Sequence, residues 1–153
     1  KKFAGGLADH SEQTIRGHTA THLLHQAIRD LLGTQVHQSG SNITSERVRF
    51  DFNFDRNLTA EELSNLELAV NEKIKENLPV KFEIMSLDEA KKIGAIGLFD
   101  EKYSDKVKIY MIGAENAYYS VEFCGGPHVN FTKEVKSFKI LRQENIGGGL
   151  RRL

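Results

Sequence analysis

Two short strings with the same spacing of metal-binding side chains constrain the fold of this chain more than any other feature. The string H-T-A-T-H contains His18 and His22, and about a hundred residues later C-G-G-P-H contains Cys124 and His128. Imidazole nitrogen and thiolate sulfur are common ligands of tetrahedral zinc. If one zinc ion binds all four side chains, the fold must bring two distant segments of the chain together.

The first pair of ligands is predicted to lie on a helix that begins at Ser11 and ends at Gly33. Ser11 is a good N-cap, Gly33 supplies a left-handed stop, and apolar residues recur at helical spacing between them. His18 and His22 are four residues apart, so they share one face of the helix and both imidazoles can reach a common point. His25 lies on the same face and is a candidate neighbour.

The rest of the pattern predicts several strands and two further helices. Capping-box sequences start helices at Thr59 and Ser86; Pro79 keeps the first from continuing, and the second ends near Gly94. Alternating or apolar runs predict strands at 48–54, 80–84, 107–111 and 118–123, with a last strand at about 137–143. The glycine triplet at 147–149 is expected to be too flexible to belong to either element. This order predicts an α+β fold, with helices packed on a largely antiparallel sheet.

The second pair of ligands is predicted to lie in a turn that follows a β-hairpin. Cys124 comes directly after the second hairpin strand, and the three residues Gly125-Gly126-Pro127 force a tight turn before His128. A turn of this kind brings residues four apart together, as a helix does. The expected zinc site therefore lies between a helix and a turn after a strand.

Two other roles for Cys124 remain open on the residues alone. A free cysteine is commonly a buried small hydrophobe. It can also be a nucleophile, for which His128 or His18 would serve as the base. A zinc protease is not expected, because H-T-A-T-H has no glutamate between its histidines to act as the general base of an H-E-x-x-H site.

Length and composition predict one globular domain without a membrane segment. The chain has 153 residues, and none of its apolar runs approaches the ~20 residues needed to cross a bilayer. A single cysteine cannot form an internal disulfide, and the N-terminal residues lack the apolar core of a secretory signal, so a cytoplasmic location is expected.

Positive charge is concentrated near the end of a chain whose formal net charge is zero. Residues 130–153 contain six basic and two acidic side chains. Such a basic tail can contact phosphates locally. The alternative is a solvated surface that happens to be basic.

Longer strings in the sequence are similar to those of a known family. They are G-G-L-A-D at 5–9, H-T-A-T-H-L-L-H at 18–25, L-L-G at 31–33, R-F-D-F at 49–52, N-E-K-I-K-E-N-L-P-V at 71–80, E-K-Y at 101–103, C-G-G-P-H at 124–128 and the closing R-R. Together they resemble the editing domain of alanyl-tRNA synthetase, whose superfamily includes freestanding alanyl-tRNA editing proteins and the editing domain of threonyl-tRNA synthetase. The G-G-L-A-D lead-in is more similar to the full-length synthetase. We therefore expect residues 1–153 to form a single aminoacyl-tRNA editing domain excised from a larger alanyl-tRNA synthetase.

The resemblance implies hydrolysis of mischarged aminoacyl-tRNA. The expected substrate is alanine tRNA wrongly esterified with serine, with glycine as a second candidate, and the other expected partner is the remainder of the synthetase. A pocket built for alanine cannot strongly exclude an amino acid one hydroxyl larger or one methyl smaller, so a second sieve is needed. The alternatives are a zinc-containing tRNA-binding module without catalysis and a metal-stabilised structural domain without a ligand.

The resemblance also carries family roles onto particular positions. The expected zinc ligands are His18, His22, Cys124 and His128; the expected catalytic residues are Gln38 and Cys124; the expected substrate contacts are Gln38, Gly125, Gly126 and Arg151. Gln38 matches a family glutamine near the aminoacyl group, and Arg151 matches the first arginine of an R-R pair. Either zinc positions the water and stabilises the oxyanion, or zinc orders the pocket and binds the substrate amino group. In the second case Gln38 and the amides of the glycine turn orient water and oxyanion.

Two positions and one segment depart from the family pattern. Pro127 replaces the usual threonine of C-G-G-T-H, which removes a hydroxyl and a backbone N–H from the turn. Ser39 stands where many relatives have lysine, and T-K-E-V-K at 132–136 replaces T-G-E-I-G. These changes bear on activity and serine specificity rather than on the fold or the metal.

Overall fold

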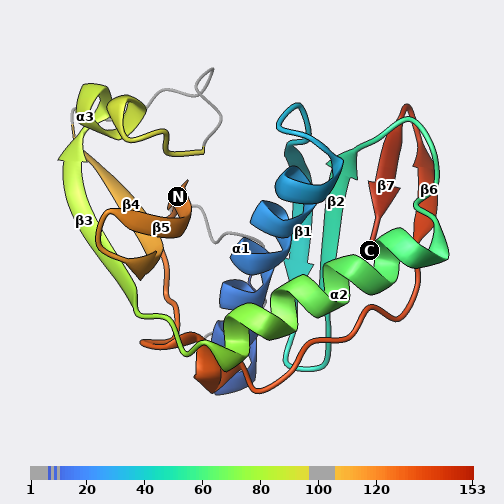
Figure 1. The fold of residues 1–153 in the computed structure, drawn as a ribbon, viewed down its shortest axis with the longest axis horizontal. Helices are drawn as coiled ribbons and strands as arrows, with labels where there is room; N and C mark the ends of the chain where they lie inside the picture. Colours follow the sequence, from blue (N-terminus) through green and yellow to red (C-terminus); the bar gives the residue numbers. More distant parts are fainter. Residues whose placement is uncertain (1–6, 8, 10, 97–105) are drawn as a thin grey trace.

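The fold consists of helices packed on two antiparallel sheets, which confirms the predicted α+β class (Figure 1). The computed structural model describes residues 7, 9, 11–96 and 106–153. The elements are α1 (Glu12–Leu32), β1 (Gln38–Ile43), β2 (Val48–Asn53), α2 (Ala60–Lys75), β3 (Val80–Ser86), α3 (Leu87–Lys92), β4 (Lys106–Ala114), β5 (Ala117–Phe123), the 3-10 helix η1 (Thr132–Val135), β6 (Glu144–Gly147) and β7 (Leu150–Arg152). One sheet has the strand order β1-β2-β7-β6, and the other has the order β3-β4-β5.

The long helix α1 lies between the two sheets and contributes to the larger core. It packs against α2, against β1 and β2 of one sheet and against β5 of the other. Its caps are those predicted: the Ser11 hydroxyl accepts a hydrogen bond from the Thr14 amide at 3.3 Å, and Gly33 ends the helix with a φ of +123°. Leu23, Ala27 and other residues of α1 are fully buried. The ligand-bearing helix is therefore held from several sides.

Gly17 marks the close approach of α1 to the four-stranded sheet. A Cβ at this position would lie 2.9 Å from Ile43 Cγ2 and 3.0 Å from Val48 Cγ2. Real Cβ atoms do not make contacts that short in a close-packed interior. The absence of a side chain lets the first half of α1 lie directly on β1 and β2.

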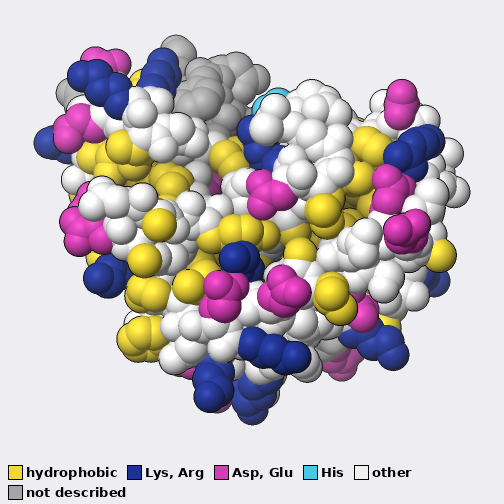
Figure 2. All heavy atoms as spheres, in the orientation of Figure 1, with side chains coloured by type: hydrophobic (Ala, Val, Ile, Leu, Met, Phe, Trp, Pro, Cys, Tyr) yellow, Lys and Arg dark blue, Asp and Glu magenta, His cyan; other side chains and the backbone are white. Residues whose placement is uncertain are grey.

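The three-stranded sheet has its own small core and an exposed apolar surface. Met85, Val107, Ile109 and Met111 are buried with α3 on one face, and the β4–β5 pairing forms the predicted hairpin. On β3, however, Phe82 and Ile84 are 50% and 64% exposed. Figure 2 shows hydrophobic side chains gathered over this region, so the alternating apolar residues of β3 lie on an exposed face.

The predicted strand at 137–143 is wrong, because this segment pairs with side chains instead of a strand. The Phe138 backbone exchanges two hydrogen bonds with the Asn71 side chain, at 2.9 and 2.7 Å, and the Ile140 amide donates to Glu67 Oε1 at 2.8 Å. These contacts satisfy the backbone from α2 without a sheet ladder. The last hairpin is formed by β6 and β7, and it includes Gly147 of the triplet that was expected to lie outside both elements.

Candidate metal centre

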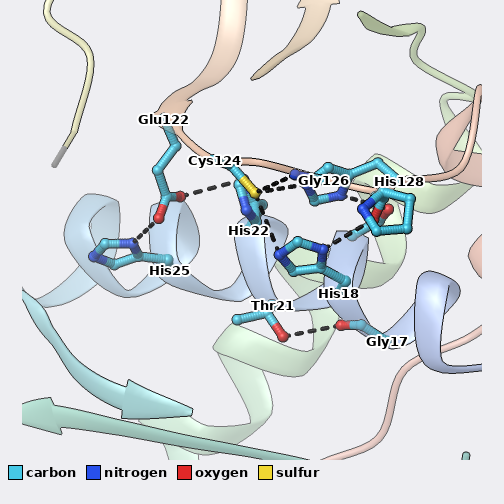
Figure 3. A network of polar contacts seen from close by, with 11 residues as sticks. Gly17, His18, Thr21, His22, His25, Glu122, Cys124, Gly126 and His128 are labelled. Carbon is cyan, nitrogen blue, oxygen red and sulfur yellow. Dashed lines mark hydrogen bonds and ion pairs between the residues drawn. The ribbon is translucent and has the colours of Figure 1, made fainter. Parts of the chain in front are cut away.

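The four predicted ligands, two from α1 and two from the turn after β5, converge on one point (Figure 3). The metal-binding atoms of His18, His22, Cys124 and His128 all lie within 4.8 Å of one another. Cys124 Sγ is 3.3 Å from Nε2 of His18 and 3.3 Å from Nε2 of His128. Bond lengths of 2.0–2.3 Å in a tetrahedral zinc site place its ligand atoms about 3.5 Å apart. The group therefore has the size and chemistry to hold a metal ion.

The backbone of the turn fixes the His18 ring in the orientation needed for metal binding. His18 Nδ1 lies 2.9 Å from the carbonyl oxygen of Pro127. A carbonyl can only accept, so Nδ1 carries the proton and Nε2 keeps a free lone pair. That lone pair is on the nitrogen facing Cys124 Sγ. The backbone of Pro127 thus supplies the acceptor that orients a candidate ligand.

The Thr19 hydroxyl orients the His128 ring in the same way, through a hydrogen bond at Nδ1. Its oxygen lies 3.4 Å from the carbonyl of Ile15, to which it donates, and it accepts from the Val129 amide at 3.2 Å. Since the hydroxyl proton is used by that carbonyl, the contact of 3.0 Å with His128 Nδ1 is a hydrogen bond donated by the histidine. His128 therefore also presents an unprotonated Nε2 to the cluster.

A buried carboxylate lies behind the third histidine. Glu122 Oε1 is 3.4 Å from His22 Nδ1, and Glu122 Oε2 is 3.3 Å from His25 Nδ1 (Figure 3). The first contact is an ion-pair distance without hydrogen-bond geometry. A carboxylate on the outer nitrogen of a ligating histidine favours the Nδ1–H form and makes the other nitrogen more basic. His18 and His128 are thus oriented by hydrogen bonds at Nδ1, whereas His22 has a carboxylate near its Nδ1.

Burial sets the protonation of the ligands. Removal from water lowers the pKa of His18 to about 4 and lowers the pKa of His22 and His128 as well, so all three imidazoles are neutral near pH 7. Burial also raises the pKa of the Cys124 thiol to about 12 without a metal. A metal ion must therefore displace a proton from Cys124 when it binds.

Burial raises the pKa of Glu122, but two neighbouring histidines lower this pKa by more. Removal of this side chain from water disfavours its charged form, whereas its contacts with His22 and His25 favour that form. The net result is that the pKa of Glu122 is lowered. The carboxylate stays ionised, accepts from His25 Nδ1 and lies at an ion-pair distance from His22 Nδ1.

The glycines of the turn have different environments. Gly126 has a φ of +74°, a Cβ there would overlap the Tyr110 ring, and its amide donates to Cys124 Sγ at 3.3 Å. Gly125 is exposed and has open space where a Cβ would lie. Among the described residues, the Gly125 amide has no hydrogen-bond acceptor. Of the two amides expected to contact substrate, only that of Gly125 is therefore available.

Gln38 and Arg151 lie on the four-stranded sheet. Gln38 begins β1 and is paired with Phe52, and no hydrogen bond joins it to the four ligands within the described part of the chain. Arg151 is 6% exposed on β7, and its Nη1 donates to Asn145 Oδ1 and to the Leu150 carbonyl, each at 3.0 Å. Its guanidinium is therefore used inside the fold.

Sequence reasoning missed Glu122, Thr19 and Tyr110. Tyr110 packs against His128 with ring centroids 4.3 Å apart. Glu122 lies two residues before Cys124 on a strand, so the period of two could have placed both on one face. The roles of Thr19 and Tyr110 depend on contacts between distant segments, for which the sequence has no local signal.

Comparisons with known proteins match both halves of the chain. The model of the threonyl and alanyl tRNA synthetase second additional domain matches residues 107–153, which include Cys124 and His128. Alanine–tRNA ligases are similar along almost the whole chain. That of Treponema denticola is 54% identical over 151 residues, which are 99% of this chain and 24% of the ligase. Those of Borrelia garinii subsp. bavariensis and Oceanobacillus iheyensis are 49% and 52% identical, over 100% and 91% of this chain and 25% and 15% of the ligases.

The fold and the site define the class of the protein: it is an α+β domain that carries a cluster of three histidines and one cysteine. The matches confirm the resemblance to the alanyl-tRNA synthetase editing domain seen in the motifs: residues 107–153 match the threonyl and alanyl tRNA synthetase second additional domain, and almost the whole chain is similar to part of the alanine–tRNA ligases. It spans about a quarter of the length of the first two ligases named. Within its described residues, none of the helices is long and apolar enough to cross a membrane.

Proposed function

We propose that the chain hydrolyses the ester bond of alanine tRNA mischarged with serine, as the editing part of an alanine–tRNA ligase. Glycine is the second candidate amino acid. The observation that carries this proposal is the convergence of four candidate ligands in a chain similar to alanine–tRNA ligases. The proposed setting is a larger synthetase in the cytoplasm, of which residues 1–153 form a single editing domain.

Zinc is the metal that best fits the four side chains. Three neutral imidazoles and one thiolate are an ordinary donor set for zinc and a poor one for magnesium or calcium, which prefer oxygen. Zinc held by His18, His22, Cys124 and His128 would supply a Lewis acid beside the aminoacyl ester. With all four bound the site is closed, and a closed tetrahedral site also orders the segments that it joins.

The chain's own groups supply the rest of the proposed site. The Gly125 amide is exposed beside Cys124, and we assign it to the oxyanion that develops as the ester carbonyl is attacked. Lys108 Nζ donates to the Gly125 carbonyl at 3.4 Å, which restrains the peptide that follows this amide. We assign Gln38 to orient the water or the aminoacyl group. The Gly126 amide donates a hydrogen bond to the Cys124 sulfur.

Arg151 receives a different role from the one its family position implies. Its guanidinium is buried and bonded to Asn145, so we assign it to the structure of the β6–β7 hairpin. Direct contact with substrate would require those contacts to break. The neighbouring Arg152 is partly exposed and is bound to Asp51 by two hydrogen bonds of 2.8 and 3.0 Å.

The test is deacylation of alanine tRNA charged with serine and, separately, with alanine. The zinc content of the same sample is determined. We expect loss of serine, sparing of alanine, and loss of the activity in Cys124→Ala. A matched control is Ser120→Ala on β5, the strand that precedes Cys124; it removes a buried hydroxyl that has no hydrogen-bond partner among the described residues. Equal hydrolysis of both substrates, or unchanged hydrolysis in Cys124→Ala, would refute the proposed editing site.

A second candidate function is a zinc-containing tRNA-binding module without catalysis. The observation in its favour is that four protein ligands are arranged around one point, which is typical of structural zinc sites. Pro127 also removes one N–H from the turn. This module would bind tRNA and zinc, leave serine on the tRNA at full zinc occupancy, and tolerate Gln38→Ala.

A further inference from the structure

Six cationic side chains from separate segments line one groove beside the first half of α1. The groove has a volume of about 650 Å³, and its walls are α1, the loop from β1 into β2, and the extended segment after η1. The cations are Arg16, Arg47, Arg49, Lys139, Arg142 and Arg152, and the acidic side chains in the lining are Glu46 and Glu144. Figure 1 shows the segment after η1 running past the loop that joins β1 and β2. In a chain with no net charge, this is a local excess of positive charge.

Ion pairs neutralise only part of this charge. Three pairs are formed: Arg16 with Glu12 at 3.5 Å, Arg142 with Glu144 at 3.0 Å, and Arg152 with Asp51 at 2.8 Å. Arg47 is bonded to the neutral Asn42. Arg49 and Lys139 form no ion pair with any described residue. The charge available to a ligand is therefore carried mainly by these last three cations, on two walls of the groove.

The groove leads toward the metal centre. Arg16 lines it and also lines a second hollow, of about 360 Å³, which includes His128. Arg16 is two residues from His18 on α1. A ligand that extends along the groove past Arg16 thus approaches the edge of the metal centre from the side of His128.

We propose that this groove binds the phosphate backbone of the tRNA acceptor arm. The identity of the RNA rests on the proposed function, whereas the choice of a polyanion rests on the charges of the groove. Cations spread over separate segments match the repeated charges of a nucleic-acid backbone. A small free phosphate would instead need donors that converge on one point. The basic tail noted in the sequence contributes only part of this surface, because α1 and the β1–β2 region supply the other half.

The test measures binding of uncharged alanine tRNA by the zinc-loaded chain at several salt concentrations. The groove variant is Arg49→Gln with Lys139→Gln. The matched control is Lys75→Gln with Lys81→Gln, which removes two exposed lysines that line neither hollow. We expect the groove variant to bind about tenfold more weakly and to lower the slope of log K against log salt by about 1 for each cation removed. The control should keep both values.

A charge-conserving variant separates electrostatics from folding. Arg49→Lys with Lys139→Arg should retain the affinity and the salt slope. The proposal is overturned if this variant loses binding like the glutamine variant, if the control loses as much as the groove variant, or if the chain does not bind tRNA at low salt. It is also overturned if the glutamine variant keeps tRNA binding but no longer associates with the remainder of the synthetase, since the groove would then be a protein interface.

The same variants distinguish this proposal from the proposed function. If the chain hydrolyses seryl-tRNA, the groove variant should raise KM with kcat unchanged, because its residues lie outside the metal centre. If the chain binds tRNA through the groove but does not hydrolyse it, the editing assignment fails and the groove assignment stands. If the groove variant hydrolyses seryl-tRNA with an unchanged KM, the groove assignment fails and the editing assignment stands.

Discussion

His18 Nδ1 donates a hydrogen bond to the carbonyl oxygen of Pro127 at 2.9 Å, across 109 residues of sequence. This bond joins the helix that carries two ligands to the turn that carries the other two. It uses a backbone atom, so the side chain at position 127 is free to vary while the ligand stays oriented.

Replacement of Glu122 by glutamine should weaken metal binding. The amide keeps the shape of the side chain but loses the negative charge beside His22 Nδ1, 3.4 Å away. Loss of a contact behind a metal ligand typically lowers affinity by about 10- to 100-fold. Competition with a chromophoric zinc chelator measures this change. Glu83→Gln, on the exposed part of β3, is the control, and equal zinc affinity in Glu122→Gln and the native chain would show that Glu122 has no such role.

Thr19→Val should cost more stability than Thr19→Ser. Valine keeps the shape but leaves the Val129 amide and His128 Nδ1 without their acceptor. A buried donor without a partner costs about 1–3 kcal/mol of unfolding free energy. Serine keeps the hydroxyl and should lose less. Denaturant unfolding of both variants measures the difference, and a valine variant as stable as the serine variant would contradict the assigned hydrogen bonds.

The two glycines of the turn should respond differently to alanine. Gly126→Ala places a Cβ 2.9 Å from Tyr110 Cε2 at a positive φ, so we expect a loss of about 1–3 kcal/mol. Gly125→Ala has open space and should change stability by less than about 0.5 kcal/mol. Thermal unfolding of the two variants provides a matched comparison. Equal effects would mean that the turn has a different conformation in solution.

Removal of the metal should destabilise the native chain but leave Cys124→Ala unaffected. A ligand that binds only the folded state stabilises it by about 4 kcal/mol when its concentration is 1,000 times its Kd. We therefore expect a strong chelator to lower the Tm of the native chain by several degrees. Melting curves with and without the chelator test this. An unchanged Tm of the native chain in the presence of the chelator would argue against a tightly bound metal.

The sequence predicted those parts of the fold whose signals are local. The spacing of His18 and His22, the capping residues and the apolar periodicity were sufficient for α1, α2, α3 and the β4–β5 hairpin. They also located the four candidate ligands that the structure brings together, because each pair is close in sequence. The convergence of the two pairs was inferred from their chemistry and from the family resemblance, because no local signal joins them.

The errors occurred where contacts between distant segments decide the outcome. Phe138 and Ile140 alternate as in a strand, but side chains of α2 satisfy their backbone. The polar string Q-S-G-S-N-I of β1 has no apolar alternation, so that strand was not predicted. From the sequence alone, Glu122 resembles a solvent-facing strand residue. In the structure it is covered by α1, which lies about a hundred residues away in sequence.

The most direct test is a titration of zinc into the metal-free chain, with the rate of serine release from mischarged alanine tRNA measured at each ratio. If the four side chains hold one metal ion that the reaction needs, the rate rises in proportion to zinc and stops rising at one zinc per chain. The Cys124→Ala chain should stay near the uncatalysed rate throughout. A rate that is independent of zinc, or no serine release at full occupancy, would contradict the account.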